Sequence, residues 1–325
     1  SFFLVISCSK DKDENEEIVA DDRMADSAMT NIYASGKVSE QTAAEAKQTI
    51  FGKWDVGGSS SKNISGSKSL SECTFNFIEF TDKSYIMSLS ITGPDGPESG
   101  SIFGNYALIE ADGLVTEVRL YFSVSGDDIH IATLSNIVVV EKASGGFDAT
   151  FDINFEIDLG DIDIVCADLG GSYSADKEPA MEETLSAGVD SNHYKLVRNW
   201  QMTSYADSDG LVLSDILLDY CLREQFDPVM GEYTEVLDPD CIVPSTFQVN
   251  LSTFGTYVTM TLDESGSPLE IQTGTWTWAN DEQTQFYVDD DWTGNISELS
   301  TTNWQFYEVH DTTDFRADYI FDAVP

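Results

Sequence analysis

The side chains that most often perform catalysis are few or unspecific in this chain. The three histidines, His130, His193 and His310, are too far apart in sequence to form a His-x-x-x-His metal pair. No Gly-x-Ser-x-Gly elbow, phosphate-binding glycine loop or dinucleotide fingerprint occurs. Carboxylates are so numerous that a pair for glycoside hydrolysis has no distinguishing signal. The sequence therefore predicts no catalytic residue, no cofactor and no enzymatic activity.

Two acidic segments offer the oxygen ligands that Ca²⁺ prefers. One is Asp-Ser-Asp-Gly at 207–210, and the other is Asp-Asp-Asp at 289–291. Neither completes the ligand spacing of an EF-hand, and both lack its closing glutamate. Solvated loop charge is the favoured interpretation, so no metal site is predicted, although the sequence leaves calcium binding by these loops open.

Cys8 is the residue with the clearest chemistry, because a thiol at this place can receive a lipid. The apolar run from Phe2 to Ile6 is typical of the end of a signal-peptide core. Val5-Ile6-Ser7-Cys8 resembles a bacterial lipobox, in which a small residue precedes the cysteine that becomes the lipidated N-terminus. The alternative is an ordinary buried cysteine behind an apolar strand. We expect residues 1–7 to be the signal-peptide end and Cys8 to carry the lipid anchor.

The residues after Cys8 form a strongly acidic stretch, which is too polar to pack and predicts a disordered tether over residues 8–38. Residues 9–17 resemble the lipoprotein export signal of the Bacteroidota, which directs a protein to the outer face of the outer membrane. The resemblance places the signal on Lys10, Asp11, Asp13 and Glu14. We expect a lipid-anchored outer-membrane protein facing the cell exterior, with a periplasm-facing lipoprotein as the alternative.

The charge of the chain excludes one large class of partners. The 325 residues carry 58 acidic and 16 basic side chains, for a net charge of -42. Such a field repels nucleic acid and anionic membrane surfaces, so nucleic-acid binding is excluded. The length is sufficient for about two domains.

An internal repeat divides the chain near residue 180. Trp54 and Trp200 each follow a short helix-like segment and open a strand, and similar Phe-rich and Gly-containing strands then recur in the same order. The polar stretch 174–180 fits a linker, and each half is expected to end in one more strand, at 147–157 and 315–321. Period-2 alternation broken by Gly, Asp and Ser predicts antiparallel strands joined by hairpins. The predicted domains are 39–178 and 179–325.

Four cysteines remain after Cys8. An oxidising compartment favours disulfides, and four cysteines allow three connectivities. If the chain divides near residue 180, only one of these keeps each bridge inside a domain, with four reduced thiols as the alternative. The expected bridges are Cys73–Cys166 and Cys221–Cys241.

Together these signals resemble the lipocalin-like domains of Bacteroidota lipoproteins. The resemblance rests on a Trp that closes an N-terminal helix, a Phe-rich strand, a Gly-x-Trp-x-Trp strand and an Ile-x-x-Leu strand. It is best in the second half, where Gly274-Thr275-Trp276-Thr277-Trp278 is intact, whereas Tyr106 replaces the first Trp in the other half. The resemblance implies an all-β protein of two tandem antiparallel up-and-down barrels. Fold similarity implies no particular function.

Helices are expected to be few and short. Residues 39–50 contain good helix formers with Ser39 as N-cap, and further helices are predicted over 192–200 and 215–225. The first two should plug one end of each barrel, packing Ile50 or Leu196 under the following Trp.

Aromatic side chains concentrate in the later strands of the second half. Trp276 and Trp278 share one strand face because they lie two residues apart. Packing inside a closed sheet is the favoured interpretation; on an open face such rings could stack on a sugar or a lipid. The candidate ligand-binding aromatics are Trp276, Trp278, Trp292 and Trp304.

Two tripeptides, at Ser27 and Thr312, match the Asp-Ser/Thr-apolar or small motif on which Bacteroidota attach O-glycans.

The sequence leaves two functions open. The first is a non-enzymatic accessory subunit of an outer-membrane assembly for transport, secretion or adhesion, held by its acylated cysteine in membrane lipid and docked on an outer-membrane or surface protein. The alternative is a lipocalin-like binder of a small apolar or glycan ligand. An exposed apolar patch with filled barrels favours the first, and an open aromatic-lined cavity favours the second.

Overall fold

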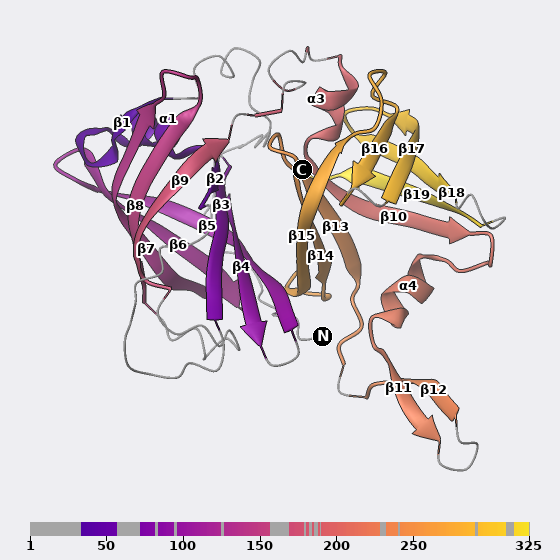
Figure 1. Cartoon of the computed structure of the whole chain (residues 1–325). Helices are drawn as coiled ribbons and strands as arrows, with labels where there is room; N and C mark the ends of the chain where they lie inside the picture. Colours follow the sequence, from indigo (N-terminus) through magenta and orange to yellow (C-terminus); the bar gives the residue numbers. More distant parts are fainter. Residues whose placement is uncertain are drawn as a thin grey trace, which may run out of the picture. The chain divides into compact units, whose positions relative to one another are not determined.

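The structure, a computed structural model, describes residues 34–324 except 57–71, 82–83, 94–95, 125–126, 157–168, 179, 182–183, 185–187, 189, 228–231, 240, 290–291 and 310–314. These residues divide into two compact units, one in each half of the chain. Each unit contains a closed antiparallel barrel of eight strands, which confirms the predicted fold class (Figure 1). The predicted tether over residues 8–38 stays a prediction over 8–33, which lie outside the described residues, but its predicted end is wrong, because Gly36–Lys37 form a short strand and Val38 is buried in the first barrel.

The first barrel is an up-and-down sheet in which strands adjacent in sequence are adjacent in space. Its closure depends on β9, which pairs with both β8 and β2, for example through Trp54 and Lys177. A two-residue strand, β1 (Gly36–Lys37), adds to the end of β7. The barrel strands are β2 (Gly52–Asp55), β3 (Glu72–Phe80), β4 (Ser84–Gly93), β5 (Gly96–Ala111), β6 (Leu114–Val124), β7 (Asp127–Glu141), β8 (Phe147–Phe155) and β9 (Gly171–Glu178).

Alternation of side chains explains why this sheet closes. In β6, Val118, Leu120 and Phe122 are fully buried, whereas the residues between them are partly exposed. Trp54 lies at the centre of the interior, with its ring centroid 5.4 Å from that of Phe80. Burying an aromatic ring of this size contributes about 2–3 kcal/mol, so the interior is the main source of stability.

A short helix closes one end of the first barrel. Helix α1 (Ala43–Ile50) follows the 3₁₀ turn η2 (Val38–Glu40), and its Ala46 and Ile50 are fully buried in the barrel core. Its N-cap is Thr42, which pairs with Glu45, so the prediction of Ser39 as cap is wrong. The predicted plug built on Ile50 is present.

The second barrel has the same closed topology. Helix α3 (Asn192–Leu196) precedes it, and Leu196 is fully buried. The helix ends four residues earlier than predicted because strand β10 begins at Asn199. The barrel strands are β10 (Asn199–Asp207), β13 (Thr246–Leu251), β14 (Thr256–Leu262), β15 (Pro268–Trp278), β16 (Gln285–Val288), β17 (Trp292–Leu299), β18 (Asn303–Val309) and β19 (Arg316–Ala323).

An insertion separates the adjacent barrel strands β10 and β13, and we call residues 208–245 the inserted arm. It contains helix α4 (Leu213–Asp219) and a separate two-stranded sheet of β11 (Leu222–Asp227) and β12 (Glu232–Leu237). Figure 1 shows this ribbon extending away from the second barrel. The helix predicted over 215–225 is therefore wrong in its second half, where the chain forms β11.

The polar stretch 174–180 is not a linker, because its residues up to Glu178 belong to β9. Tyr173, Ala175 and Lys177 face the barrel interior in alternation, and Lys177 is only 2% exposed. Because a lysine occupies an interior position, the alternation of apolar and polar residues typical of a strand is not visible in this segment. Counting strands along each barrel, β8 is therefore equivalent to β18, and β9 is equivalent to β19. The prediction that 147–157 and 315–321 are equivalent last strands of the two halves is wrong.

Candidate functional site

The four candidate tryptophans lie within the second barrel. Trp276 and Trp278 come from β15 and Trp304 from β18, and all three are buried, while Trp292 on β17 is half-buried. The rings of Trp276 and Trp278 are 5.6 Å apart, and Trp304 lies 4.9 Å from Phe321. These distances place the rings in mutual contact, which is the packing interpretation of the sequence.

The end of this barrel beneath α3 is held by a buried histidine. His193 stacks on Trp276 at 5.8 Å, and its Nδ1 accepts a 3.0 Å hydrogen bond from Trp278 Nε1. Burial lowers the pKa of His193 to about 4, so the ring is neutral at physiological pH. Trp276 Nε1 donates to the carbonyl of Ser252 at 3.0 Å. These contacts join α3 to β15 and so hold the plug in place.

A second polar group lies among the rings of β17, β18 and β19. Glu308 is 8% exposed; it accepts hydrogen bonds from Trp292 Nε1 and, at 3.1 Å, from the Tyr319 hydroxyl. The rings of Tyr205 and Tyr319 lie 5.0 Å apart. Burial and a hydrogen bond to Asp207 raise the pKa of Tyr205 to about 12, so its phenol stays protonated. The carboxylate is thus satisfied by neighbouring donors.

The acidic loops use their carboxylates to stabilise turns. Asp207 Oδ1 accepts from the backbone N–H groups of Asp209 and Leu211, both at 2.9 Å. Asp289 accepts from the Thr275 N–H at 2.7 Å and from the Tyr257 hydroxyl, also at 2.7 Å. Among the described residues no group of three or more His, Cys, Asp or Glu side chains could hold a metal ion. Asp290 and Asp291 lie outside the described residues.

One predicted disulfide is confirmed. Cys221 and Cys241 are bonded, with their Cα atoms 5.5 Å apart, and the bridge closes the ribbon of the inserted arm. The side chain of Cys73, on β3, and all of Cys166 lie outside the described residues. The same holds for Cys8, Lys10, Asp11, Asp13, Glu14, Ser27 and Thr312, so the predictions on these residues stay predictions.

The inserted arm exposes an unusual amount of apolar surface. Six of the ten exposed large hydrophobic side chains of the described residues lie in it. None of the residues of α4 is buried, although four of its seven are Leu or Ile. Leu213, Ile216 and Leu217 are partly buried and Leu218 is exposed, so α4 covers its apolar face only in part. The six exposed side chains, which we call the arm patch, are Leu211, Val212, Leu218, Leu237, Ile242 and Val243.

Three members of the arm patch are drawn together by the disulfide. Cys221 N–H donates to the carbonyl of Leu218, and Asp238 N–H donates to the carbonyl of Cys221, both at 2.9 Å. Ile242 directly follows Cys241, to which Cys221 is bonded. The backbones of Leu218, Leu237 and Ile242 are therefore all tied close to one bridge, and the side chain of Ile242 is 60% exposed.

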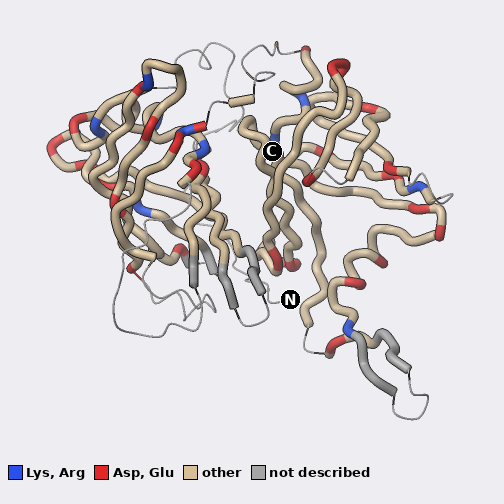
Figure 2. The backbone as a smooth tube through the Cα atoms, viewed as in Figure 1, with Lys and Arg blue, Asp and Glu red and all other residues tan. Residues whose placement is uncertain are grey.

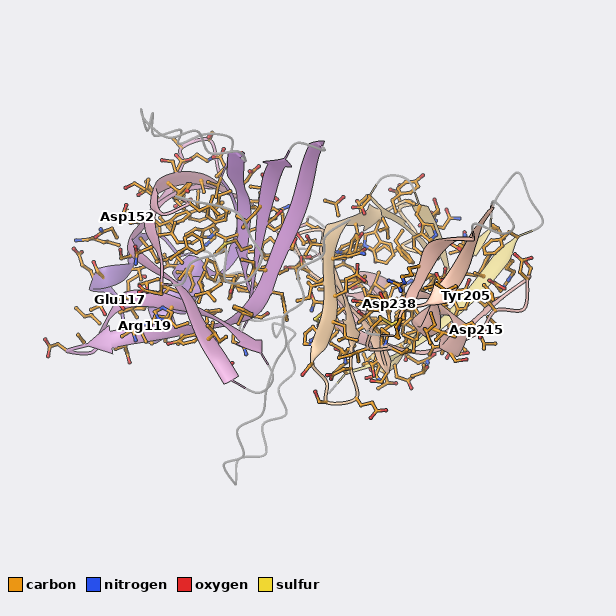
Figure 3. All side chains as sticks on the ribbon, turned by 90° about the horizontal axis from the view of Figure 1, so that it is seen from below. Glu117, Arg119, Asp152, Tyr205, Asp215 and Asp238 are labelled. Atoms are coloured by element: carbon orange, nitrogen blue, oxygen red, sulfur yellow. A yellow bond between two sulfur atoms is a disulfide. The ribbon has the colours of Figure 1, made fainter. Side chains whose placement is uncertain are left out.

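Acidic side chains border this patch. Asp215 accepts a 2.9 Å hydrogen bond from the Val212 N–H at the start of α4, and Asp238 lies 3.6 Å from Arg223. Figure 3 labels both carboxylates. Figure 2 shows acidic residues outnumbering basic ones over both barrels.

Sequence reasoning identified the bridge but not the arm. Trp200 and Phe247 lie more than twice as far apart in sequence as their counterparts Trp54 and Phe75. That excess length, together with a cysteine pair inside it, is the signal that an insertion is present.

Comparisons with known proteins give no family. No protein-family model and no curated protein matches the chain. One solved structure, a protein of unknown function from the DUF3598 family of Nostoc punctiforme, is 11% identical over 84% of this chain and 96% of its own. Its TM-score of 0.12 is too low to carry an argument. Across the described residues no helix has both the length and the apolar character needed to cross a bilayer.

Proposed function

We propose that this protein is a non-enzymatic accessory subunit that docks on a partner protein through the arm patch. The observation that carries the proposal is a disulfide-closed insertion that holds most of the exposed apolar side chains of the described residues. Exposed apolar patches on soluble proteins mark interaction sites. The packed rings of the second barrel favour this function over ligand binding inside the barrel.

The stability of the arm supports the same conclusion. A two-stranded ribbon is marginally stable in water, and a seven-residue helix is too short to persist without packing. A disulfide with a sequence separation of 20 contributes about 3 kcal/mol by restricting the unfolded chain. Covering each half-exposed Leu or Ile would contribute about 1 kcal/mol more. A bound partner would cover the exposed apolar side chains and so stabilise the inserted arm.

The location of the protein belongs to the same proposal. A lipid on Cys8 would hold it in the outer membrane, and the acidic residues after it would direct it to the cell surface. The partner would be an outer-membrane or surface protein of a transport, secretion or adhesion assembly. Asp215 contacts the Val212 N–H, and Asp219 directly follows Leu218 in the sequence, so the partner's docking surface should be apolar with basic residues beside it.

Co-purification with a matched pair of variants tests this proposal. The wild type and the double variant Leu237→Asp/Ile242→Asp would be purified gently from source membranes, and co-eluting proteins quantified by mass spectrometry. The control is Val140→Asp, which changes an equally exposed side chain on β7 of the first barrel. We expect one stoichiometric partner with the wild type and the control, and at least a tenfold loss with the arm variant. Equal recovery with all three, or no stoichiometric partner at all, would refute docking through the arm.

A further inference from the structure

The outer face of the first barrel carries an ordered array of polar side chains that its fold does not require. Tyr121 on β6 pairs with Asn105 on β5 and His130 on β7, and Arg119 pairs with Thr133. Thr133 in turn pairs with Asn154 on β8. These residues alternate with the buried side chains of the same strands, so they point outward. We call the following set the outer platform: Asn105, Glu117, Arg119, Tyr121, His130, Thr133, Asn154 and Glu156.

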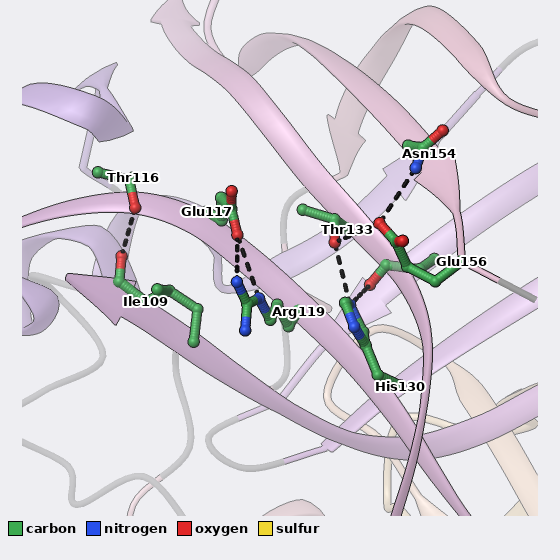
Figure 4. A network of polar contacts seen from close by, with 9 residues as sticks. Ile109, Thr116, Glu117, Arg119, His130, Thr133, Asn154 and Glu156 are labelled. Carbon is green, nitrogen blue, oxygen red and sulfur yellow. Dashed lines mark hydrogen bonds and ion pairs between the residues drawn. The ribbon is translucent and has the colours of Figure 1, made fainter. Parts of the chain in front are cut away.

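Hydrogen bonds hold part of the outer platform in one arrangement (Figure 4). The Thr133 hydroxyl donates to Glu156 Oε1 at 3.2 Å, and Asn154 Nδ2 donates to the same oxygen at 3.0 Å. His130 Nε2 lies 3.1 Å from the carbonyl of Ala132, which can only accept. Because a carbonyl oxygen can only accept, His130 Nε2 is the donor in this contact.

The guanidinium of Arg119 is held in the same way. Its Nε and Nη2 donate to Glu117 Oε2 at 3.1 and 3.0 Å, which engages two of five donors. The guanidinium also has a hydrogen bond to the side chain of Tyr121, and the side chains of Arg119 and Glu117 are 38% and 37% exposed, so this group of side chains is accessible from solvent. Exposed ion pairs of this kind contribute little to stability, which leaves their ordering unexplained by the fold.

The platform also contains an aromatic surface. The rings of Tyr121 and His130 are 5.2 Å apart and inclined by 33°, and both are half-buried. A half-exposed ring beside planar side chains that both donate and accept matches the chemistry of a sugar. The C–H face of a pyranose packs on an aromatic ring, while its vicinal hydroxyls pair with amide, guanidinium and carboxylate groups.

We propose that the outer platform binds a neutral oligosaccharide. Charge selects the neutral class: Glu117 and Glu156 lie within the platform, and the net charge of -42 repels uronic acids and other anionic sugars. Cations are disfavoured because Arg119 engages Glu117, and Thr133 and Asn154 engage Glu156. This site is separate from the arm patch and does not depend on the docking proposal.

Calorimetric titration with defined sugars tests this site. The probes are hexasaccharides of glucose, mannose and N-acetylglucosamine, with hexagalacturonate as the anionic comparison. We expect at least one neutral probe to bind, and hexagalacturonate to bind at least tenfold more weakly. Failure of every neutral probe, or equal binding of hexagalacturonate, would overturn the proposal.

Variants locate the site on the protein. Tyr121→Ala and Asn154→Ala should each weaken binding of the neutral probe at least tenfold, with melting curves confirming the fold. The control is Tyr287→Ala, which removes an exposed tyrosine from β16 of the second barrel. Asn154 is exposed, so its variant gives an answer even if Tyr121→Ala does not fold. Binding unchanged in the Asn154 variant and in any folded Tyr121 variant would refute the placement.

Discussion

Trp278 and His193 are joined inside the second barrel by a 3.0 Å hydrogen bond from the indole Nε1 to the imidazole Nδ1. The bond links β15 to the plug helix α3 and requires that Nδ1 carry no proton. Protonation of His193 would therefore break the contact and leave a charge among aromatic rings.

Acid should loosen the second barrel through this histidine. Burial lowers its pKa from 6.5 to about 4, so the unfolded chain binds the proton more tightly than the folded one. Stability is then present above pH 6.5 and is lost as the pH falls toward 4, by about 3 kcal/mol. We expect His193→Asn, whose amide oxygen can replace Nδ1, to flatten this dependence. The free energy of unfolding of the wild type and the variant would be measured with denaturant at pH 7 and pH 4.5. The same loss of stability in both proteins would exclude His193 as the cause.

Lys177 should make the stability of the first barrel depend on pH above 7. Its Nζ donates to the carbonyl of Thr49 in α1 at 2.8 Å, and burial lowers its pKa to about 7. The unfolded chain therefore binds more protons between pH 7 and 10.5, and stability rises with pH by up to about 1.4 kcal/mol per unit. Unfolding of the wild type and Lys177→Met from pH 7 to 9 measures the effect. A rise that persists in the methionine variant would contradict it.

Two buried indoles offer a matched comparison. Trp276 Nε1 donates to Ser252, whereas Trp304 Nε1 has no hydrogen-bond partner in the part of the chain that the structure describes. Replacement by Phe removes a similar volume at both places. We expect Trp276→Phe to cost about 1 kcal/mol more than Trp304→Phe, because only the first replacement removes a buried hydrogen bond. Thermal unfolding of the two variants measures the loss of stability in each. Equal losses would mean that only the packing of the rings, and not the indole hydrogen bond, contributes.

Cys8→Ala should release the protein from membranes, because two or more acyl chains are needed for stable anchoring. Fractionation of the variant and the wild type measures this directly. Neutralising Asp11, Asp13 and Glu14 provides the companion experiment: membrane attachment should persist while digestion by external protease declines. Membrane retention of the alanine variant would exclude the lipid anchor.

The sequence predicts the barrels well because their strands alternate strongly. Val118, Leu120 and Phe122 in one half and Trp276 and Trp278 in the other occupy alternate positions and are buried. Prediction failed where a polar residue occupies an interior position, since Lys177 turned β9 into an apparent linker.

It failed again where local propensity is ambiguous. The helix predicted over 215–225 is present only up to Asp219, and residues from Leu222 onward form β11 because they pair with β12 next to the Cys221–Cys241 bridge. The outer platform could not be predicted, because its residues come together only through the register of β5 to β8. The residues around His130 in the sequence give no sign of the side chains that lie beside it on the sheet.

The position of the inserted arm has a consequence for how this protein can diversify. Strands β10 and β13 pair directly through Asn199 and Asn250, so the barrel closes whatever lies between them. The intervening 208–245 segment can then be lengthened, shortened or exchanged without loss of the scaffold. A graft of this segment onto another closed barrel should transfer partner choice as a unit, and relatives of this chain should differ there more than anywhere else.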